Sequence, residues 1–430
     1  MQKPNAVNRI VETSRAGASA AGAALLLALA PAATLAQPAS YGGGGAPPEA
    51  AAAPGLAAST VPPAIQQVRR HMLDADVNSL TFHAMDQIFY TRVVGRSGPV
   101  WELPSVTRPL DFTYVYDGKT YAADEFLERN RTNALLILKG GKIVTEIYRN
   151  NTGPNTRFMS WSMAKSITSL MVGLAVSEGR IHSIDDPIVR YLPELKDGGY
   201  KAATIRDVLE MKSGVDYEER YDFEHPGTAA RNHESSLVEN VTRFADAART
   251  IPSKAPPGTL FQYKTLDTAV LGWLVERVAG MNAASYMTSR IWERLGAQSD
   301  AFFIMDGPPG VGREFTGAGF NATLRDYARL GQMVLDGGSA HGEQIVPKAW
   351  IEEATRSYVK DSPEGGYGYQ WWVAPGGKSF YALGLQGQYI FVDPASRTVI
   401  VKLSYFKPGD QTAYAEAAAF MQAAAAWRPN

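Results

Sequence analysis

Segments typical of β-strands stand at both ends of the chain, and a helix-rich stretch separates them. On the N-terminal side, residues 134–148 indicate two strands around the turn Gly140-Gly141. On the C-terminal side, strand-like segments occur at 367–373, 379–385, 388–394 and 398–406. We therefore predict an α/β fold in which both ends build one sheet covered by helices, with a mainly helical second lobe at roughly 185–340.

The helices are expected from apolar periodicity and from the residues that begin and end each segment. The clearest covers 162–178 and stops at Gly179, because glycine is favoured just after the end of a helix. Further helices are expected at 204–211, 265–278, 283–295, 323–335 and 412–427. The aromatic-rich segment 107–127 carries Asp117-Gly118, which indicates a hairpin or a short extension.

The first 36 residues have the layout of an export signal. A start bearing Lys3, Arg9 and Arg15 precedes a small apolar run, and small residues follow where signal peptidase cleaves. We interpret 1–36 as a secretory signal peptide, so the mature protein is expected in the periplasm or outside the cell; a retained membrane anchor is the alternative. The Ala, Pro and Gly-rich stretch 37–64 is expected to be a flexible linker.

Composition excludes several kinds of function. The chain has no cysteine, which rules out disulfides, thiolate metal sites and cysteine nucleophiles. Its 42 Lys and Arg residues balance 43 Asp and Glu residues, so no excess of positive charge is available for a nucleic-acid backbone. No segment after the signal is long and apolar enough to span a membrane. The motifs G-x-S-x-G, H-E-x-x-H and G-x-G-x-x-G and the P-loop are all missing.

The nucleophile pattern that remains is S-x-x-K, which occurs at Ser162–Lys165, Ser357–Lys360 and Ser404–Lys407. Only Ser162 opens a long apolar helix, where residues three apart share a face and the positive helix end favours an anionic oxygen. Burial among apolar neighbours is expected to lower the pKa of Lys165, so that its amine can take a proton from the serine. Taken alone, the motif suits equally well a helix cap followed by a surface lysine.

A second candidate is Tyr263, about a hundred residues downstream and just before the helix expected at 265–278. Its phenol can relay the serine proton to a leaving group. A buried tyrosine that caps a helix is the alternative.

A third candidate is the segment GLQGQ at 384–388, which precedes a strand. Gly387 lets a substrate approach the backbone closely, and the amides of Gln388 and Ser162 can point at a developing oxyanion. A plain strand with a bulge is the alternative.

These three elements, in this order, resemble the penicillin-recognising serine hydrolases. That family has S-x-x-K, then Y-x-N or Y-x-S, then a strand tripeptide such as H-x-G or K-x-G. The resemblance runs from about Asn133 to the C-terminus, and YGYQWWV, GLQGQ and VIVKLSYF are most similar to the branch of 6-aminohexanoate-dimer hydrolases and family VIII esterases. It implies a β-lactamase/DD-peptidase-like fold, with an antiparallel sheet flanked by helices, in a domain at 131–430 that follows an extension at 65–130.

The resemblance also implies roles for individual residues. Ser162 becomes the nucleophile, Lys165 the base that activates it and Tyr263 the acid that protonates the leaving group, while the amides of Ser162 and Gln388 form the oxyanion hole. Tyr221 matches a substrate-contacting tyrosine of that branch. Further candidates for substrate contact are Trp161, Thr265, Gln386, Gly387 and Trp372. For the two tryptophans, packing inside the fold is the alternative.

Two departures from the family pattern bear on the substrate. Thr265 stands where the family has Asn or Ser, and Leu385 stands where β-lactamases and peptidases carry Lys or His. We therefore expect an exported serine hydrolase that cleaves an amide or ester bond in a small linear substrate through an acyl-enzyme, with no metal or other cofactor. A β-lactamase or DD-peptidase and a catalytically silent ligand-binding homologue are the alternatives. The expected partner is a small molecule and not nucleic acid, and the oligomeric state stays open.

Overall fold

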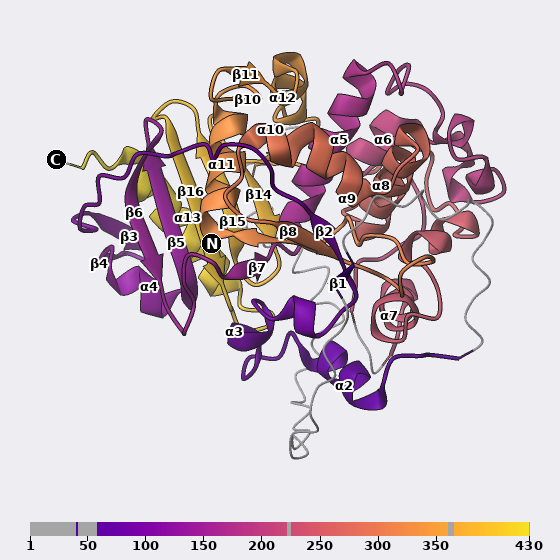
Figure 1. Cartoon of the computed structure of the whole chain (residues 1–430), viewed down its shortest axis with the longest axis horizontal. Helices are drawn as coiled ribbons and strands as arrows, with labels where there is room; N and C mark the ends of the chain where they lie inside the picture. The colour runs from indigo at the N-terminus through magenta and orange to yellow at the C-terminus, as the bar shows by residue number, and fades with distance from the viewer. Residues whose placement is uncertain (1–39, 42–57, 222–224, 360–364, 430) are drawn as a thin grey trace.

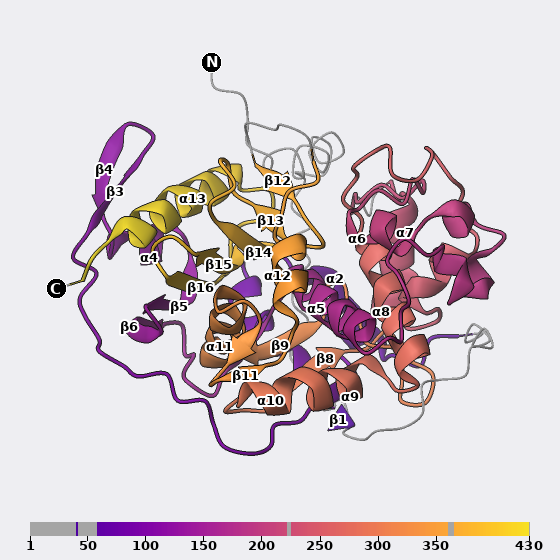
Figure 2. The same ribbon diagram turned by 90° about the horizontal axis from the view of Figure 1, so that it is seen from above.

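Strands from both ends of the chain form one seven-stranded antiparallel sheet in the order β12-β13-β14-β15-β16-β5-β6 (Figure 1 and Figure 2). This arrangement, seen in a computed structural model that describes residues 40–41, 58–221, 225–359 and 365–429, confirms the predicted sheet. The strands are β5 (Thr132–Lys139), β6 (Lys142–Tyr148), β12 (Gly366–Tyr367), β13 (Trp372–Val373), β14 (Phe380–Gly384), β15 (Gln388–Asp393) and β16 (Thr398–Ser404). The expected signal peptide and the larger part of the expected linker lie outside the described residues.

Helices cover both faces of this sheet (Figure 2). On one face lie α5 (Met163–Ser177) and α11 (Leu324–Leu335), and on the other lies α13 (Gln411–Ala426). Successive strand residues point to opposite faces, so along β5 one set of side chains packs toward α11 and the alternate set toward α13. The helix α11 lies within the range predicted for the helical lobe, and it packs on the main sheet.

A second, five-stranded sheet was not predicted. Its order is β1-β2-β8-β9-β7, with β1 parallel to β2 and the other pairs antiparallel. Its strands are β1 (Ser40–Tyr41), β2 (Thr91–Val94), β7 (Arg157–Met159), β8 (Ala301–Ile304) and β9 (Phe320–Thr323). Each is too short for a period-two pattern to stand out in the sequence. Since β7 leads directly into α5, this sheet supports the start of the helix that carries Ser162.

The helical lobe lies beside the two sheets (Figure 1). It contains α6 (Ile205–Leu209), α7 (Thr228–His233), α8 (Thr265–Ala279), α9 (Ala283–Met287) and α10 (Glu293–Leu295). Short helical turns occur at Met85–Gln87, Ile188–Arg190, Pro193–Leu195, Gly199–Ala202, Glu234–Val238, Phe244–Arg249 and Thr288–Trp292. Nowhere in the described part of the chain is a helix long and apolar enough to cross a membrane.

The remaining elements come mostly from the N-terminal extension. They are α2 (Pro63–His71), α3 (Asn78–Thr81), the hairpin β3 (Thr113–Tyr116) to β4 (Lys119–Ala122), α4 (Glu125–Arg129), the hairpin β10 (Ser339–Ala340) to β11 (Glu343–Gln344), and α12 (Lys348–Ala354). The hairpin in 107–127 turns at Asp117-Gly118, and both residues have the positive φ that a tight hairpin turn requires.

The segment at 367–373, predicted as one strand, folds back on itself. Its two ends form β12 and β13, and Tyr367 pairs with Trp372. Gln370 has a φ of 65°, and a Cβ on Gly368 would lie 2.1 Å from the carbonyl oxygen of Ala354. The turn therefore depends on a close approach to α12 that the alternating aromatic pattern does not reveal.

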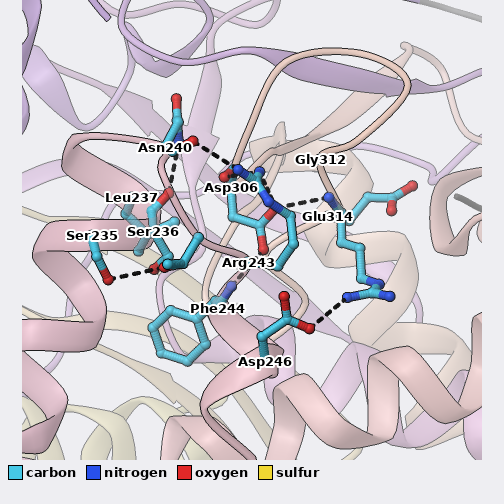
Figure 3. A network of polar contacts seen from close by, with 12 residues as sticks. Ser235, Ser236, Leu237, Asn240, Arg243, Phe244, Asp246, Asp306, Gly312 and Glu314 are labelled. Carbon is cyan, nitrogen blue, oxygen red and sulfur yellow. Dashed lines mark hydrogen bonds and ion pairs between the residues drawn. The ribbon is translucent and has the colours of Figure 1, made fainter. Parts of the chain in front are cut away.

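A buried ion pair fastens the helical lobe to the second sheet (Figure 3). Arg243 Nη1 lies 3.1 Å from Asp306 Oδ1, and both side chains are almost fully buried. The same carboxylate accepts hydrogen bonds from the amides of Phe244 and Arg313, each at 2.8 Å. Because the loss of either partner would leave a buried charge uncompensated, the pair holds the two regions together.

Candidate active site

Ser162 stands at the N-terminus of α5, and Lys165 lies one turn further along the same face. Ser162 is partly exposed, whereas only 1% of Lys165 is exposed. The serine side chain makes no capping hydrogen bond to the helix backbone. Instead its Oγ accepts a hydrogen bond of 3.0 Å from Lys165 Nζ. The alternative of a helix cap with a surface lysine therefore does not hold.

The amine of Lys165 is enclosed by three oxygen atoms. Besides Ser162 Oγ, Nζ donates to Thr265 Oγ1 at 3.0 Å and to the carbonyl oxygen of Gly317 at 2.8 Å. Burial lowers the pKa of Lys165 to about 8, and the nearby charge of Glu219 raises it. Burial disfavours the charged amine, so a neutral lysine is accessible near neutral pH.

Glu219 is the acidic partner of this group, and it was not predicted from the sequence. Its carboxylate accepts hydrogen bonds from the amide of Thr265 at 2.8 Å and from the hydroxyl of Thr265 at 2.5 Å. Thr265 is the first residue of α8, where the positive end of the helix favours a carboxylate. No spacing links 219 to 265 in the sequence, so only the fold reveals this contact.

These partners decide which group can give a proton to Lys165. A neutral amine has two N–H groups and one lone pair. The carbonyl of Gly317 can only accept, and the hydroxyl proton of Thr265 is committed to Glu219. Both therefore take the two N–H groups, and Ser162 is left as the neighbour that can donate to the lone pair. The arrangement selects the serine hydroxyl for deprotonation.

Tyr263 completes the group from the segment before α8. The ring centroid of Tyr263 lies 4.9 Å from Lys165 Nζ. Burial raises the pKa of Tyr263, while a hydrogen bond with Ser162 lowers it. The phenol is thus protonated at neutral pH and close to the serine, which is what a proton donor to a leaving group needs.

The third predicted element lies at the ends of two neighbouring strands of the main sheet, β14 and β15. Gly384 ends β14 and pairs with Gln388, which begins β15. A Cβ on Gly384 would lie 2.2 Å from the carbonyl oxygen of Ser160, so only glycine allows the sheet to approach the start of α5. This contact brings the backbone of Gln388 toward Ser162. In the same turn, Leu385 is 41% exposed.

Tyr221 joins the site through Glu219. Its hydroxyl donates to Glu219 Oε1 at 2.6 Å, and its side chain is partly open to solvent. Its ring also packs edge-on against His233, with ring centroids 5.6 Å apart. Tyr221 is therefore an exposed aromatic group tied to the residues around Lys165.

The two tryptophans predicted to contact substrate pack inside the fold. Trp372 is 5% exposed and stacks on Tyr263, with ring centroids 5.7 Å apart, so it supports the phenol. Trp161 is also buried and meets Phe82 edge-on at 5.3 Å. Both rings are packed against aromatic neighbours, as the alternative has it, and their contact with substrate stays a prediction.

Gln386 and Gly387, which were also predicted to contact substrate, are buried. Gln386 is 3% exposed, and its side-chain amide bonds to Asn78 and Leu73 of the extension. Gly387 has a φ of 92°, and a Cβ there would lie 2.5 Å from the ring of Phe406. Both residues shape the turn before Gln388, and their contact with substrate stays a prediction.

A metal site does not form in the part of the chain that the structure describes. No three His, Asp or Glu side chains gather there in a way that could hold a metal ion. The chemistry that this group of residues can perform is proton transfer and nucleophilic attack by the serine.

Comparison with known proteins decides the family, because a sequence model of the beta-lactamase family matches residues 122–425. The chain belongs to the beta-lactamase family. It is 32% identical over 353 residues to the 6-aminohexanoate-dimer hydrolase of Paenarthrobacter ureafaciens, covering 78% of this chain and 88% of that protein. The residues matched by the family model include all three motifs quoted from the sequence, and both comparisons support a serine hydrolase.

Solved structures agree with the beta-lactamase fold. A protein from Bacillus anthracis, named as a candidate 6-aminohexanoate-dimer hydrolase, superposes with a TM-score of 0.74 at 25% identity, covering 82% of this chain and 95% of that one. A family VIII carboxylesterase superposes with a TM-score of 0.52 at 16% identity, covering 69% and 96% of the two chains. The second likeness concerns the fold alone. The predicted family and fold are confirmed, and the chain is a serine hydrolase of this family.

Proposed function

We propose that this hydrolase cleaves an amide or ester bond in a small linear substrate through an acyl-enzyme on Ser162. The observation that carries the proposal is the hydrogen-bond arrangement around Lys165, in which Thr265 and Gly317 accept and Ser162 alone can donate. A serine activated in this way is a nucleophile toward a carbonyl carbon.

Acylation then follows from the positions of the side chains. Ser162 Oγ attacks the carbonyl carbon as its proton passes to Lys165, and the amides of Ser162 and Gln388 stabilise the oxyanion. Tyr263 gives a proton to the leaving nitrogen or oxygen and regains one from Lys165. Water hydrolyses the acyl-enzyme by the same route in reverse, which restores the serine.

Two features favour a linear amide or ester over a β-lactam or a cell-wall peptide. Leu385 presents an exposed apolar side chain where β-lactam-processing relatives are expected to carry a cation. The relative from Paenarthrobacter is named as a hydrolase of the 6-aminohexanoate dimer, in which an amide bond can join the two amino-acid units. We extend that substrate class, and not that compound in particular, to this chain.

Export is a separate part of the proposal. It rests on the basic start, apolar run and small residues of the first 36 positions. Expression of the full chain with N-terminal sequencing of the mature product tests it. An N-terminus near Gln37 in the periplasm or medium supports export, and an intact Met1 in the cytoplasm contradicts it.

The catalytic proposal is tested by intact mass after incubation with a fluorophosphonate, with turnover of p-nitrophenyl butyrate measured alongside. We expect one adduct on Ser162 and loss of turnover, and neither an adduct nor turnover in Ser162→Ala. A panel of short linear amides, the 6-aminohexanoate dimer and nitrocefin then defines the substrate. Hydrolysis of nitrocefin alone would favour a β-lactamase. A wild-type protein with neither adduct nor turnover would indicate a ligand-binding homologue.

A further inference from the structure

One short segment of the N-terminal extension contacts the backbone on both sides of the expected oxyanion hole. This segment, residues 73–82, includes α3 and lies beside β7 below the main sheet (Figure 1). We call it the brace. One of its ends reaches the turn before Gln388, and the other reaches the strand that leads to Ser162.

The first contact joins the brace to the turn at 385–387. Asn78 Nδ2 donates to Gln386 Oε1 at 2.7 Å and to the carbonyl oxygen of Phe406 at 2.8 Å. Gln386 Nε2 in turn donates to the carbonyl oxygen of Leu73 at 2.8 Å. Asn78 is fully buried and Gln386 nearly so. These bonds span more than 300 residues of sequence.

Gln386 needs such support because its backbone is strained. Its φ of 56° lies in the left-handed region, which a residue with a side chain adopts only when its surroundings hold it there. Every polar group of Gln386 has a partner: its amide donates to Tyr414 Oη at 2.8 Å, and its carbonyl accepts from the amide of Phe406 at 3.1 Å. The side-chain bonds to the brace complete the set.

The second contact joins the brace to the residues before the nucleophile. The carbonyl oxygen of Phe82 accepts a hydrogen bond of 2.8 Å from the amide of Met159, at the end of β7. The ring of Phe82 packs edge-on against Trp161 at 5.3 Å. Trp161 has a φ of 45° and immediately precedes Ser162. The brace therefore holds a second strained residue next to the second oxyanion donor.

The hydrogen bonds of Asn78 show that it holds the turn through its side-chain N–H groups. Its Oδ1 is buried and has no hydrogen-bond partner among the described residues. An amide that leaves one buried atom unsatisfied is costly. Its side-chain nitrogen, Nδ2, donates two hydrogen bonds. One goes to Gln386 in the turn, and the other goes to Phe406, whose ring packs beneath the turn.

We propose that the brace is a positioning element of the active site, and that Asn78 is a positioning residue for the oxyanion hole. By holding Gln386 and Trp161 in strained conformations, it keeps the amides of Gln388 and Ser162 aimed at one point. This inference rests on the proposed function. It assigns a role in catalysis to the extension at 65–130, outside the region that carries the family motifs.

The test compares Asn78→Asp and Asn78→Leu with Asn130→Asp. The aspartate has the same shape but cannot donate to the turn, and the leucine removes the donors without adding charge. Asn130 is an equally buried amide whose Nδ2 donates to the carbonyl of Ala413 at 2.9 Å, on α13 and not on the turn. It therefore controls for the general loss of a buried hydrogen bond.

We expect both Asn78 variants to lower kcat for p-nitrophenyl butyrate by about 10- to 100-fold, less than the full loss of one oxyanion donor. KM should change by less than about threefold, because the ground-state carbonyl depends little on these donors. Labelling of Ser162 by the fluorophosphonate should slow by a similar factor, and the midpoint of the pH–rate profile should stay in place. Asn130→Asp should keep kcat within about threefold of wild type.

Three results would overturn the inference while the wild type remains active. They are unchanged kcat in both Asn78 variants, an equal fall in the Asn130 control, or a shifted pH midpoint that shows an effect through Lys165. Absence of labelling and turnover in the wild type would instead defeat the proposed function. If Asn78→Asp does not fold, Asn78→Leu still decides the question, because it introduces no buried charge.

Discussion

Two buried lysines of this chain each donate a hydrogen bond to a serine hydroxyl, and only one of these pairs is arranged for catalysis. Lys165 bonds to Ser162 at the start of α5, and Lys402 bonds to Ser404 within β16. Burial lowers the pKa of both lysines. A lysine of lowered pKa beside a serine is therefore not sufficient to define the site.

The difference lies in the remaining neighbours. Lys402 Nζ also donates to the carbonyl of Asn130 at 3.2 Å and lies over the rings of Phe126 and Phe406. No tyrosine hydroxyl and no helix N-terminus faces this pair among the contacts of the described residues, and Ser404 is 1% exposed. Substrate cannot reach Ser404, whereas Ser162 is partly open to solvent. A nucleophilic serine therefore differs from a structural serine in two ways: substrate can reach it, and a nearby acid can protonate the leaving group.

The largest expected contrast comes from removing each serine hydroxyl. Ser162→Ala should lower kcat/KM for p-nitrophenyl butyrate by at least about 10³-fold, as loss of a nucleophile does. Ser404→Ala should leave kcat/KM within about threefold of wild type, because only its backbone bonds to Gln388. Steady-state kinetics on both variants checks this. Equal losses would mean that the two pairs do not differ in the way described.

The second difference between the two lysine–serine pairs is the acid, Tyr263, which lies beside Ser162. Tyr263→Phe keeps the ring that stacks on Trp372 but removes the hydroxyl, so the fold should remain. We expect kcat to fall by about 10²- to 10⁴-fold. The loss should be larger for an amide than for p-nitrophenyl butyrate, whose leaving group needs no proton. Equal losses on both substrates would contradict the role of proton donor.

The sequence predicted the parts of the site that lie in local patterns. Ser162 and Lys165 share a helix whose end is set by Gly179, and Tyr263 precedes a second clear helix, so local patterns together with the family resemblance located them. Glu219 was missed because its link to Thr265 is purely tertiary. The hydrogen bonds that hold Gln386 in the turn before Gln388 are tertiary in the same way, so the sequence did not reveal them.

The fold shows the same division between local and tertiary information. Hairpins at Gly140-Gly141 and Asp117-Gly118 carry their own turn signals, and both are present. The strands of the second sheet are short and come from distant parts of the chain, so no window of sequence reveals their pairing. The faces of Trp161 and Trp372 are set by how helices and sheets pack, which periodicity does not specify.

Glu219 offers a way to tune the catalytic lysine without touching it. Glu219→Gln removes the charge that raises the pKa of Lys165, so that pKa should fall further below about 8. Lys165 must be neutral to accept a proton, so activity rises with pH through its pKa, and the acidic limb of the kcat/KM profile should move to lower pH. At the pH optimum we expect a loss of about tenfold, because the amide can donate to Thr265 and free its hydroxyl to compete for the amine. A pH profile of wild type and variant measures both effects, and a shift to higher pH would contradict the arrangement.

Replacement of Lys402 should have the smallest effect on activity, and it tests how a buried lysine affects stability. Lys165 cannot test this separately, because it also takes part in catalysis. The pKa of Lys402 in the folded protein lies well below the value of 10.5 expected when exposed. The unfolded chain therefore binds more protons between the two pKa values, so the free energy of unfolding rises with pH across that window, and the cost of burial is largest below the folded pKa.

Lys402→Met should accordingly stabilise the protein at pH 7 by about 1 kcal/mol or more, because a buried ionisable group is replaced by an apolar one of similar length. The advantage should shrink as the pH approaches 10.5, where the unfolded wild-type lysine also loses its proton. Urea unfolding at several pH values measures this, with kcat as a control that should stay within about threefold. A destabilised variant whose deficit does not depend on pH would show that the bonds to Ser404 and Asn130 outweigh desolvation. Lys402 would then be a charged structural lysine, and the two pairs would differ in protonation as well as in access.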